Sequence, residues 1–172
     1  MKFFVLYTTR DGKVAELKAM TWPPGQGVSQ PQARLGGGYE QRQAFYAYTR
    51  AFSGAKFDEF SRYYADDVVL ELGSVPPIHG RDGIVDFYRP MFANVREQLT
   101  PHEVSMDDDS IHMDATTRFT AVEDAPDFVV GPLRKGDYIE GRVFVDYQLR
   151  DGLIARISVR RGGDMVKHEA PS

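Results

Sequence analysis

Apolar and polar residues alternate with a period of two in three segments of the chain, residues 110–122, 137–149 and 153–161. This alternation is typical of strands in a sheet that is buried on one face. We therefore predict three neighbouring strands with an apolar face and a charged face. The apolar face carries Ile111, Met113, Ala115, Thr117, Phe119, Ala121, Ile139, Val143, Val145, Tyr147, Leu149, Ile157 and Val159. The charged face carries His112, Asp114, Thr116, Arg118, Thr120, Glu140, Arg142, Phe144, Asp146, Gln148, Arg156, Ser158 and Arg160.

Three stretches that precede these strands have a helical period instead. Apolar residues recur there three or four positions apart, which places them on one stripe of a helix. We expect Gly54 to end the first helix, and Pro90 to bend or end the third. The stripes consist of Phe45, Tyr48 and Phe52; of Phe57, Phe60 and Tyr64; and of Ile84, Phe87, Tyr88 and Met91.

A short strand and a turn separate the second helix from the third. Residues 68–72 are apolar apart from Glu71, which predicts a strand with contacts on both faces. Pro76 and Pro77 cannot continue a strand ladder, and Gly80 permits an unusual backbone conformation, so a turn follows.

The first 38 residues follow a different pattern. Residues 1–22 contain two β-prone runs around Asp11-Gly12, a turn dipeptide, and so predict a hairpin. It is either an added sheet edge or an arm that reaches a partner subunit. The next residues, up to Gly38, are rich in proline and glycine, as in a connector. We expect a hairpin and linker at 1–38, a main domain at 39–163 and a tail at 164–172.

Composition restricts the classes of function. With 21 Lys and Arg against 25 Asp and Glu, and no basic block, the chain is not expected to bind nucleic acid. It has no cysteine, which excludes disulfides and thiolate nucleophiles. The apolar run at residues 3–7 is too short for a signal peptide or a membrane span, so we expect no membrane partner and a cytoplasmic protein.

One segment resembles a known family. Residues 64–89 read YADDVVLELGSVPPIHGRDGIVDFYR, which is similar to the equivalent part of ketosteroid isomerases in the nuclear transport factor two-like (SnoaL-like) superfamily. A weaker likeness extends from about Gln41 to Gly163. The resemblance implies an α+β fold in which three helices wrap a curved antiparallel sheet. Such a cystatin-like, cone-shaped α+β barrel encloses an apolar pocket and is often dimeric.

The family's two carboxylates have no match in this chain. The resemblance places the isomerase base at Leu72, with Glu71 one residue earlier and pointing the other way. It places the acid that donates to the oxyanion near Val145. Because a base and an oxyanion donor each contribute orders of magnitude in rate, steroid isomerisation by that route is not expected.

The tyrosines of that pocket are retained. Tyr64 and Tyr88 match two of three isomerase tyrosines, and the third falls on Ala47 or Tyr48, of which helical phase favours Tyr48. These phenols either hold an oxygen of a ligand, or Tyr64 and Tyr88 bond to each other and fill the core. The candidate bases are His102, by its similarity to a pocket histidine of related dehydratases, and Glu71 if a bulge turns it inward.

A second similarity is to limonene-epoxide hydrolases, which share the fold and activate water with an Arg and an Asp. Arg142 and Asp146 resemble that pair. They belong, however, to the face opposite Val143 and Val145. Charge pairing on a solvated or dimer-facing surface is the preferred interpretation.

No metal and no cofactor are expected. The four histidines, at positions 79, 102, 112 and 168, lack metal-ligand spacing. Asp107-Asp108-Asp109 is interpreted as a turn, because the spaced ligands of a calcium loop are absent. There is also no glycine-rich phosphate loop.

These observations predict a concave pocket for a small apolar carbonyl or hydroxyl compound. Its function is that of a cofactor-independent isomerase, dehydratase or cyclase, or of a non-catalytic ligand-binding or dimerisation module. A homodimer is expected through the charged face. The predicted catalytic residues are Tyr48, Tyr64, Tyr88 and His102, and the predicted ligand-binding residues are Leu72, Phe87, Phe119, Val145, Ile157 and Val159.

Overall fold

The structure is a computed structural model that describes residues 2–10, 13–22, 34–73 and 75–170. The chain divides into two compact units, residues 1–30 and 31–172. In the first unit, strands β1 (Lys2–Arg10) and β2 (Lys13–Trp22) pair antiparallel, so the predicted hairpin is confirmed. The Asp11-Gly12 turn and most of the predicted connector lie outside the described residues.

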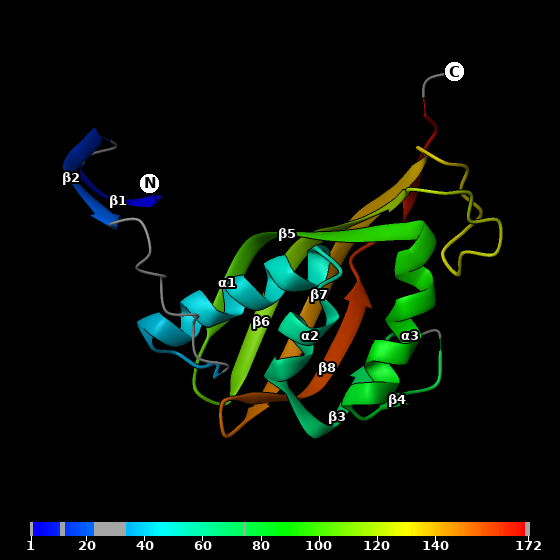
Figure 1. The fold of residues 1–172 in the computed structure, drawn as a ribbon, viewed down its shortest axis with the longest axis horizontal. Coiled ribbons are helices and arrows are strands. Elements are labelled where there is room, and N and C mark those ends of the chain that lie inside the picture. Colours follow the sequence, from blue (N-terminus) through cyan, green and yellow to red (C-terminus); the bar gives the residue numbers. More distant parts are fainter. Residues whose placement is uncertain (1, 11–12, 23–33, 74, 171–172) are drawn as a thin grey trace. The chain divides into compact units, whose positions relative to one another are not determined.

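The second unit combines three α-helices with a curved, unclosed sheet of seven strands, and the helices lie over one side of that sheet (Figure 1). The helices are α1 (Tyr39–Ser53), α2 (Phe57–Phe60), which a 3-10 turn (Ser61–Tyr63) follows, and α3 (Arg81–Asn94). The strands are β3 (Tyr64–Glu71), β4 (Ile78–His79), β5 (Val95–Met106), β6 (Ser110–Ala121), β7 (Tyr138–Arg150), β8 (Leu153–Arg161) and β9 (Val166–His168).

The strand order is β4-β3-β8-β7-β6-β5, and β9 pairs with the start of β7. Neighbouring strands are antiparallel except β3 and β8, which are parallel, so the sheet is mixed. Consecutive strands from β5 to β8 are joined by short connections or a single loop, which favours antiparallel pairing. No hairpin joins β3 to β8, because α3 and three long strands lie between them in the chain.

Element boundaries differ from the sequence prediction around the segment that resembles the isomerases. β3 begins at Tyr64 rather than at Val68. α3 continues through Pro90 to Asn94, and β5 then starts directly at Val95, so that Pro101 and His102 lie within a long strand. Among the described residues β5 pairs only with β6, and an edge strand tolerates a proline because one side of its backbone has no partner. The register shifts just after Pro101, as at a bulge.

The turn between β3 and α3 requires its glycine. Gly80 has φ 79° and ψ 157°, which side-chain-bearing residues rarely adopt, and its N–H donates to the carbonyl oxygen of Val68 at 2.7 Å. Arg81, the first residue of α3, donates to the carbonyl oxygen of Tyr64 at 2.6 Å. These two bonds hold the beginning of α3 against β3 and thereby fix the position of both Tyr64 and the α3 side chains.

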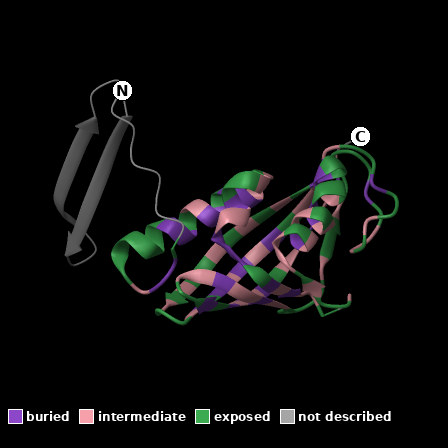
Figure 2. Ribbon diagram, turned by 60° about the horizontal axis from the view of Figure 1, so that its bottom comes forward, coloured by how far each residue is buried: buried purple, intermediate pink, exposed green. Residues whose placement is uncertain are grey.

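The core lies between the helices and the apolar face of the sheet. Along β6 and β7 buried residues alternate with partly buried or exposed ones, as the period of two predicts (Figure 2). Phe45 of α1 is fully buried, and its ring contacts Tyr147 of β7 edge to face, with centroids 5.4 Å apart. A smaller apolar cluster lies where β5, β6 and the 122–137 loop meet; it consists of Val95, Ala121, Ala125, Leu133 and Ile139.

Candidate functional site

A cavity of about 530 Å³ lies between helices α1 and α3 and the apolar face of the sheet. This volume falls within the range of small-molecule sites. Most of its lining is aliphatic or aromatic. It includes all six predicted ligand-binding residues, and three of the four predicted catalytic residues. These are Leu72, Phe87, Phe119, Val145, Ile157 and Val159, together with Tyr48, Tyr64 and Tyr88.

Strand phase explains why these residues meet. Val143, Val145 and Tyr147 alternate along β7, and Ile157 and Val159 alternate along β8, so all five project from the same face of the sheet. The pairing of Val145 with Val159 and of Tyr147 with Ile157 places them side by side. The period of two in the sequence was therefore sufficient to predict the floor of the cavity.

Four tyrosines form the polar part of this lining. The hydroxyl groups of Tyr48 and Tyr64 are 3.2 Å apart and form a hydrogen bond. Tyr147 packs at right angles to Tyr48, with ring centroids 6.0 Å apart. Burial is the main cause that raises the pKa of all three, and of Tyr88, well above the usual value near 10, so they are hydrogen-bond donors at neutral pH.

Tyr88 differs from the bonded pair. The alternative that Tyr64 and Tyr88 bond to each other does not match the structure, in which Tyr64 bonds to Tyr48. Tyr88 is held by edge-to-face packing on Phe52, with centroids 5.0 Å apart, and its residue is 7% exposed. Among the described residues none forms a hydrogen bond with its hydroxyl. A buried phenol without a protein partner can donate to a ligand.

The cavity also contains a carboxylate, Glu97 of β5, that was not among the predicted site residues. Thr117 Oγ1 donates to Glu97 Oε1 at 2.9 Å, and no described residue bonds to the other carboxylate oxygen. Burial raises the pKa of Glu97 to about 7, and the bond from Thr117 opposes this shift. The negative charge of Glu97 in turn contributes to the raised pKa values of Tyr48, Tyr64, Tyr88 and Tyr147, so the carboxylate and the phenols share one environment.

A signal for Glu97 was present in the sequence. Val95, Glu97 and Leu99 alternate with Arg96, Gln98 and Thr100, so that Glu97 lies in phase with apolar residues. Pro101 obscures this pattern, because proline within a run argues against a strand. In the structure Val95 and Leu99 do pack into the apolar clusters beside Glu97.

The other two candidate bases lie outside the cavity. His102 is exposed, and its Nε2 lies 2.8 Å from Oγ1 of Thr116, a residue of the charged face. Glu71 accepts hydrogen bonds from Arg156 and Ser158, which belong to the same charged face, so no bulge turns it inward.

The charged face consists of paired side chains. Arg142 forms an ion pair with Asp114, and Arg118 with Glu140. Arg160 donates to Asp146 at 3.1 Å. Arg142 and Asp146, the two residues that resemble the epoxide-hydrolase pair, are therefore bonded to different partners and do not line the cavity.

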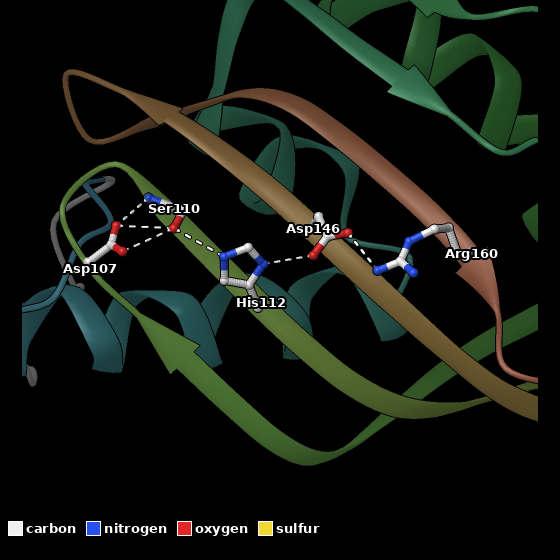
Figure 3. A network of polar contacts seen from close by, with 5 residues as sticks. All are labelled: Asp107, Ser110, His112, Asp146 and Arg160. Carbon is white, nitrogen blue, oxygen red and sulfur yellow. Dashed lines mark hydrogen bonds and ion pairs between the residues drawn. The ribbon is translucent and has the colours of Figure 1, made fainter.

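Figure 3 shows a chain of polar contacts on this face. Ser110 Oγ lies 3.3 Å from His112 Nε2, and His112 Nδ1 lies 2.7 Å from Asp146 Oδ1, which is the order of a Ser-His-Asp triad. The Ser110 hydroxyl, however, is also 3.1 Å from each carboxylate oxygen of Asp107. Asp107 already accepts the N–H groups of Asp109 and Ser110, so the hydroxyl closes the β5–β6 turn. One hydroxyl proton cannot serve Asp107 and His112 together.

Among the described residues no three His, Asp or Glu side chains are arranged to hold a metal ion. The described helices also include none that is long and apolar enough to span a membrane.

Solved structures of other proteins share this fold. A proposed polyketide cyclase from Xanthomonas campestris pv. campestris is 22% identical, with a TM-score of 0.58 over 67% of this chain and 84% of that chain. An epoxide hydrolase of the limonene-epoxide-hydrolase type from M. tuberculosis is 18% identical, with a TM-score of 0.56 over 69% and 80%. A proposed ketosteroid isomerase from Kribbella flavida is 20% identical, with a TM-score of 0.52 over 76% and 82%. At these identities the likeness establishes the fold and not the activity.

A search of curated proteins found no match to this sequence. The model of one protein family does match, the SnoaL-like domain, over residues 43–157. This range contains most of α1, all of α3 and β7, the first part of β8, and Glu97. The chain therefore belongs to the SnoaL-like domain family of the nuclear transport factor two-like superfamily.

Proposed function

We propose that this protein is a cofactor-independent enzyme that moves a proton within a small apolar carbonyl compound, as an isomerase, dehydratase or cyclase does. The observation that carries the proposal is Glu97, a carboxylate with a pKa near 7 in a mostly apolar cavity that tyrosines also line. A group whose pKa matches the working pH is well suited to take up and return a proton. Folding places this carboxylate in an environment that disfavours its charge, which a purely structural residue does not require.

Glu97 supplies the base in this mechanism. Its ionised carboxylate takes a proton from the carbon next to the carbonyl group of the ligand. The electron pair of that C–H bond forms a new C=C double bond, and the carbonyl π pair moves to oxygen, which gives an enolate. In a β,γ-unsaturated ligand the enolate is a dienolate, and return of the proton from Glu97 to its γ carbon completes an isomerisation. Departure of a β-hydroxyl group, which takes the proton from Glu97 and leaves as water, would complete a dehydration. Attack of the enolate carbon on a second carbonyl, whose oxygen takes that proton, would complete a cyclisation.

Tyr88 supplies the donor to the oxygen. Its hydroxyl is protonated at neutral pH and has no bond to the described protein residues, so it can donate to the carbonyl oxygen as negative charge develops. The Tyr48–Tyr64 pair provides a second donor, because a pair of hydroxyls linked by one hydrogen bond retains one proton for another acceptor. The mostly aliphatic and aromatic lining lowers the polarity around these groups, which strengthens each of these interactions.

A non-catalytic binding module is the alternative, and one observation favours it. The hydroxyls of Tyr48 and Tyr64 bond to each other, as they would in a packed core that only holds a ligand. The two functions differ in what Glu97 does: a base is essential for turnover, whereas a binding cavity would tolerate its neutral isostere.

The test uses 2-tetralone, an apolar ketone with acidic α-hydrogens, in deuterated water. Exchange of these hydrogens is followed by proton NMR, and binding by chemical-shift changes of the protein. The wild-type protein should accelerate exchange above the buffer rate, Glu97→Gln should abolish the acceleration, and Glu103→Gln, an exposed glutamate of the same strand, should retain it. If the ketone binds and the wild-type protein leaves exchange at the buffer rate, the enzyme proposal is wrong and the binding module stands.

A further inference from the structure

Besides Glu97, two charged side chains line the cavity, Arg160 and Arg161 at the end of β8. Arg161 is in phase with Ile157 and Val159, which places it on the apolar face of the sheet. Arg160 is in phase with the charged face and donates to Asp146 at 3.1 Å. Arg161 is exposed, and among the described residues it has no acidic partner.

Arg161 is well separated from Glu97. Arg161 pairs with Val143 of β7, which pairs with Ala115 of β6, which pairs with Pro101 of β5. Glu97 lies four residues before Pro101 on the same strand. With about 4.8 Å between strands and about 3.4 Å per residue, this register separates the two residues by roughly 20 Å along the sheet.

The pKa of Glu97 agrees with this separation. A nearby cation would lower it, whereas burial raises it to about 7 and only the hydrogen bond from Thr117 opposes that shift. Arg161 therefore does not neutralise the carboxylate. The cavity has an acidic group at one end of its lining and an unpaired cation at another, with aliphatic and aromatic side chains between them.

We propose that the ligand of this cavity is an apolar acid, whose carboxylate binds Arg161 while its apolar body fills the cavity. The inference rests on the proposed function and specifies its substrate class: apolar carbonyl compounds that also carry a carboxylate. A guanidinium group presents parallel N–H donors that match the two oxygens of a carboxylate. Because Arg161 already projects from the apolar face, binding requires no protein ion pair to be broken.

The roles of the two ends then differ. Arg161 does not touch the reacting carbon. It binds the acid group of the ligand, and so determines which substrates enter the cavity and how deeply they are inserted. Glu97 would repel a carboxylate placed beside it, because like charges in a buried site raise each other's free energy. Together these charges orient an apolar acid with its carboxylate at β8 and its uncharged part toward Glu97 and Tyr88.

The experiment compares decanoate with 1-decanol, which has the same chain without the charge, by isothermal titration calorimetry at pH 7.5. The proteins are the full-length wild type, Arg161→Gln and Arg142→Gln. Arg142→Gln is the matched control, because it removes the same charge from an exposed arginine of the charged face that does not line the cavity. Loss of a charged hydrogen bond should weaken decanoate binding to Arg161→Gln by about ten-fold or more. The affinity of Arg161→Gln for 1-decanol should change by less than about two-fold. Arg142→Gln should bind both compounds as the wild type does.

Three outcomes would overturn the proposal, and they differ in what they say of the proposed function. Equal decanoate affinity in the wild type and Arg161→Gln would show that Arg161 binds no acid, while the cavity still accepts apolar ligands. An equal loss in both arginine variants would show an effect of net charge alone. If neither decanoate nor 1-decanol binds to the wild-type protein, the cavity is not an apolar ligand site and the proposed function fails as well.

Discussion

Replacing Glu97 by glutamine should make the folded protein more stable at pH 8 than the wild type. Glutamine keeps the shape of the side chain and removes its ionisation. Burial raises the pKa of Glu97 from an ordinary 4.5 to about 7, so the folded protein binds this proton more tightly than the unfolded chain does. The stability that the protonated carboxyl contributes is fully present below about pH 4.5, and is lost as the pH rises through 7.

The size of the effect follows from the difference between the two pKa values. Each pKa unit corresponds to about 1.4 kcal/mol, so the difference between 4.5 and about 7 corresponds to roughly 3 kcal/mol at pH 8. Because structural relaxation around an ionised carboxylate reduces this figure, it is an upper bound, and we expect Glu97→Gln to gain about 1–3 kcal/mol over the wild type at pH 8. At pH 4.5 the two proteins should differ by less than about 1 kcal/mol.

Urea denaturation at pH 4.5, 5, 6, 7 and 8, followed by far-ultraviolet circular dichroism, measures these free energies of unfolding. Tryptophan fluorescence is unsuitable, because the single tryptophan, Trp22, belongs to β2 in the other compact unit. Histidine titrations cancel in the difference between wild type and variant. Glu59→Gln, an exposed glutamate paired with Lys56, is the control and should show no such pH dependence. A difference between wild type and Glu97→Gln that stays constant from pH 5 to 8 would refute a raised pKa at Glu97.

The remaining predictions concern the donors, the core and the assembly. Tyr88→Phe should lower the rate of 2-tetralone exchange by about 10²–10³-fold and leave the urea midpoint nearly unchanged; a change in the midpoint alone would mean that Tyr88 only fills the core. Thr117→Val removes the donor that opposes the raised pKa of Glu97, so the midpoint of the pH–rate profile should move upward, and a downward shift would contradict the assigned bond. Phe45→Ala should cost about 3–5 kcal/mol in urea denaturation, against little for Tyr39→Ala, which truncates a 65% exposed residue of the same helix. We also expect a homodimer through the charged face, and sedimentation of a monomer at micromolar concentration would exclude it.

The fold was predictable from the sequence because its strands are buried on one face only. The period of two in residues 137–149 fixes which side chains of β7 point inward, and the resemblance of residues 64–89 supplies the order of the elements. The parallel pairing of β3 with β8 was not predictable in this way, since no local pattern encodes the direction of strands that are far apart in the chain.

The residues of the candidate site were predictable where the inward positions of a helix or strand hold apolar or aromatic residues. They were not predictable where such a position holds a charged residue. Tyr48, Tyr64 and Tyr88 follow helical or strand phase, and the structure places all three around one cavity. Glu97 occupies an inward position that a carboxylate usually avoids, and its proximity to the phenols depends on the packing of α3 against β5. Only the three-dimensional arrangement reveals that burial has changed its pKa.

Carbon NMR of the protein labelled with ¹³C at the glutamate carboxyl carbon would test the central claim most directly. A pH titration of the ligand-free protein follows each carboxyl group, and the signal that is missing in Glu97→Gln identifies Glu97. We predict that this signal titrates with a midpoint near pH 7, because burial raises the pKa of Glu97 to about 7. A midpoint near 4.5, the ordinary value for glutamate, would contradict the assignment of Glu97 as the base of the site.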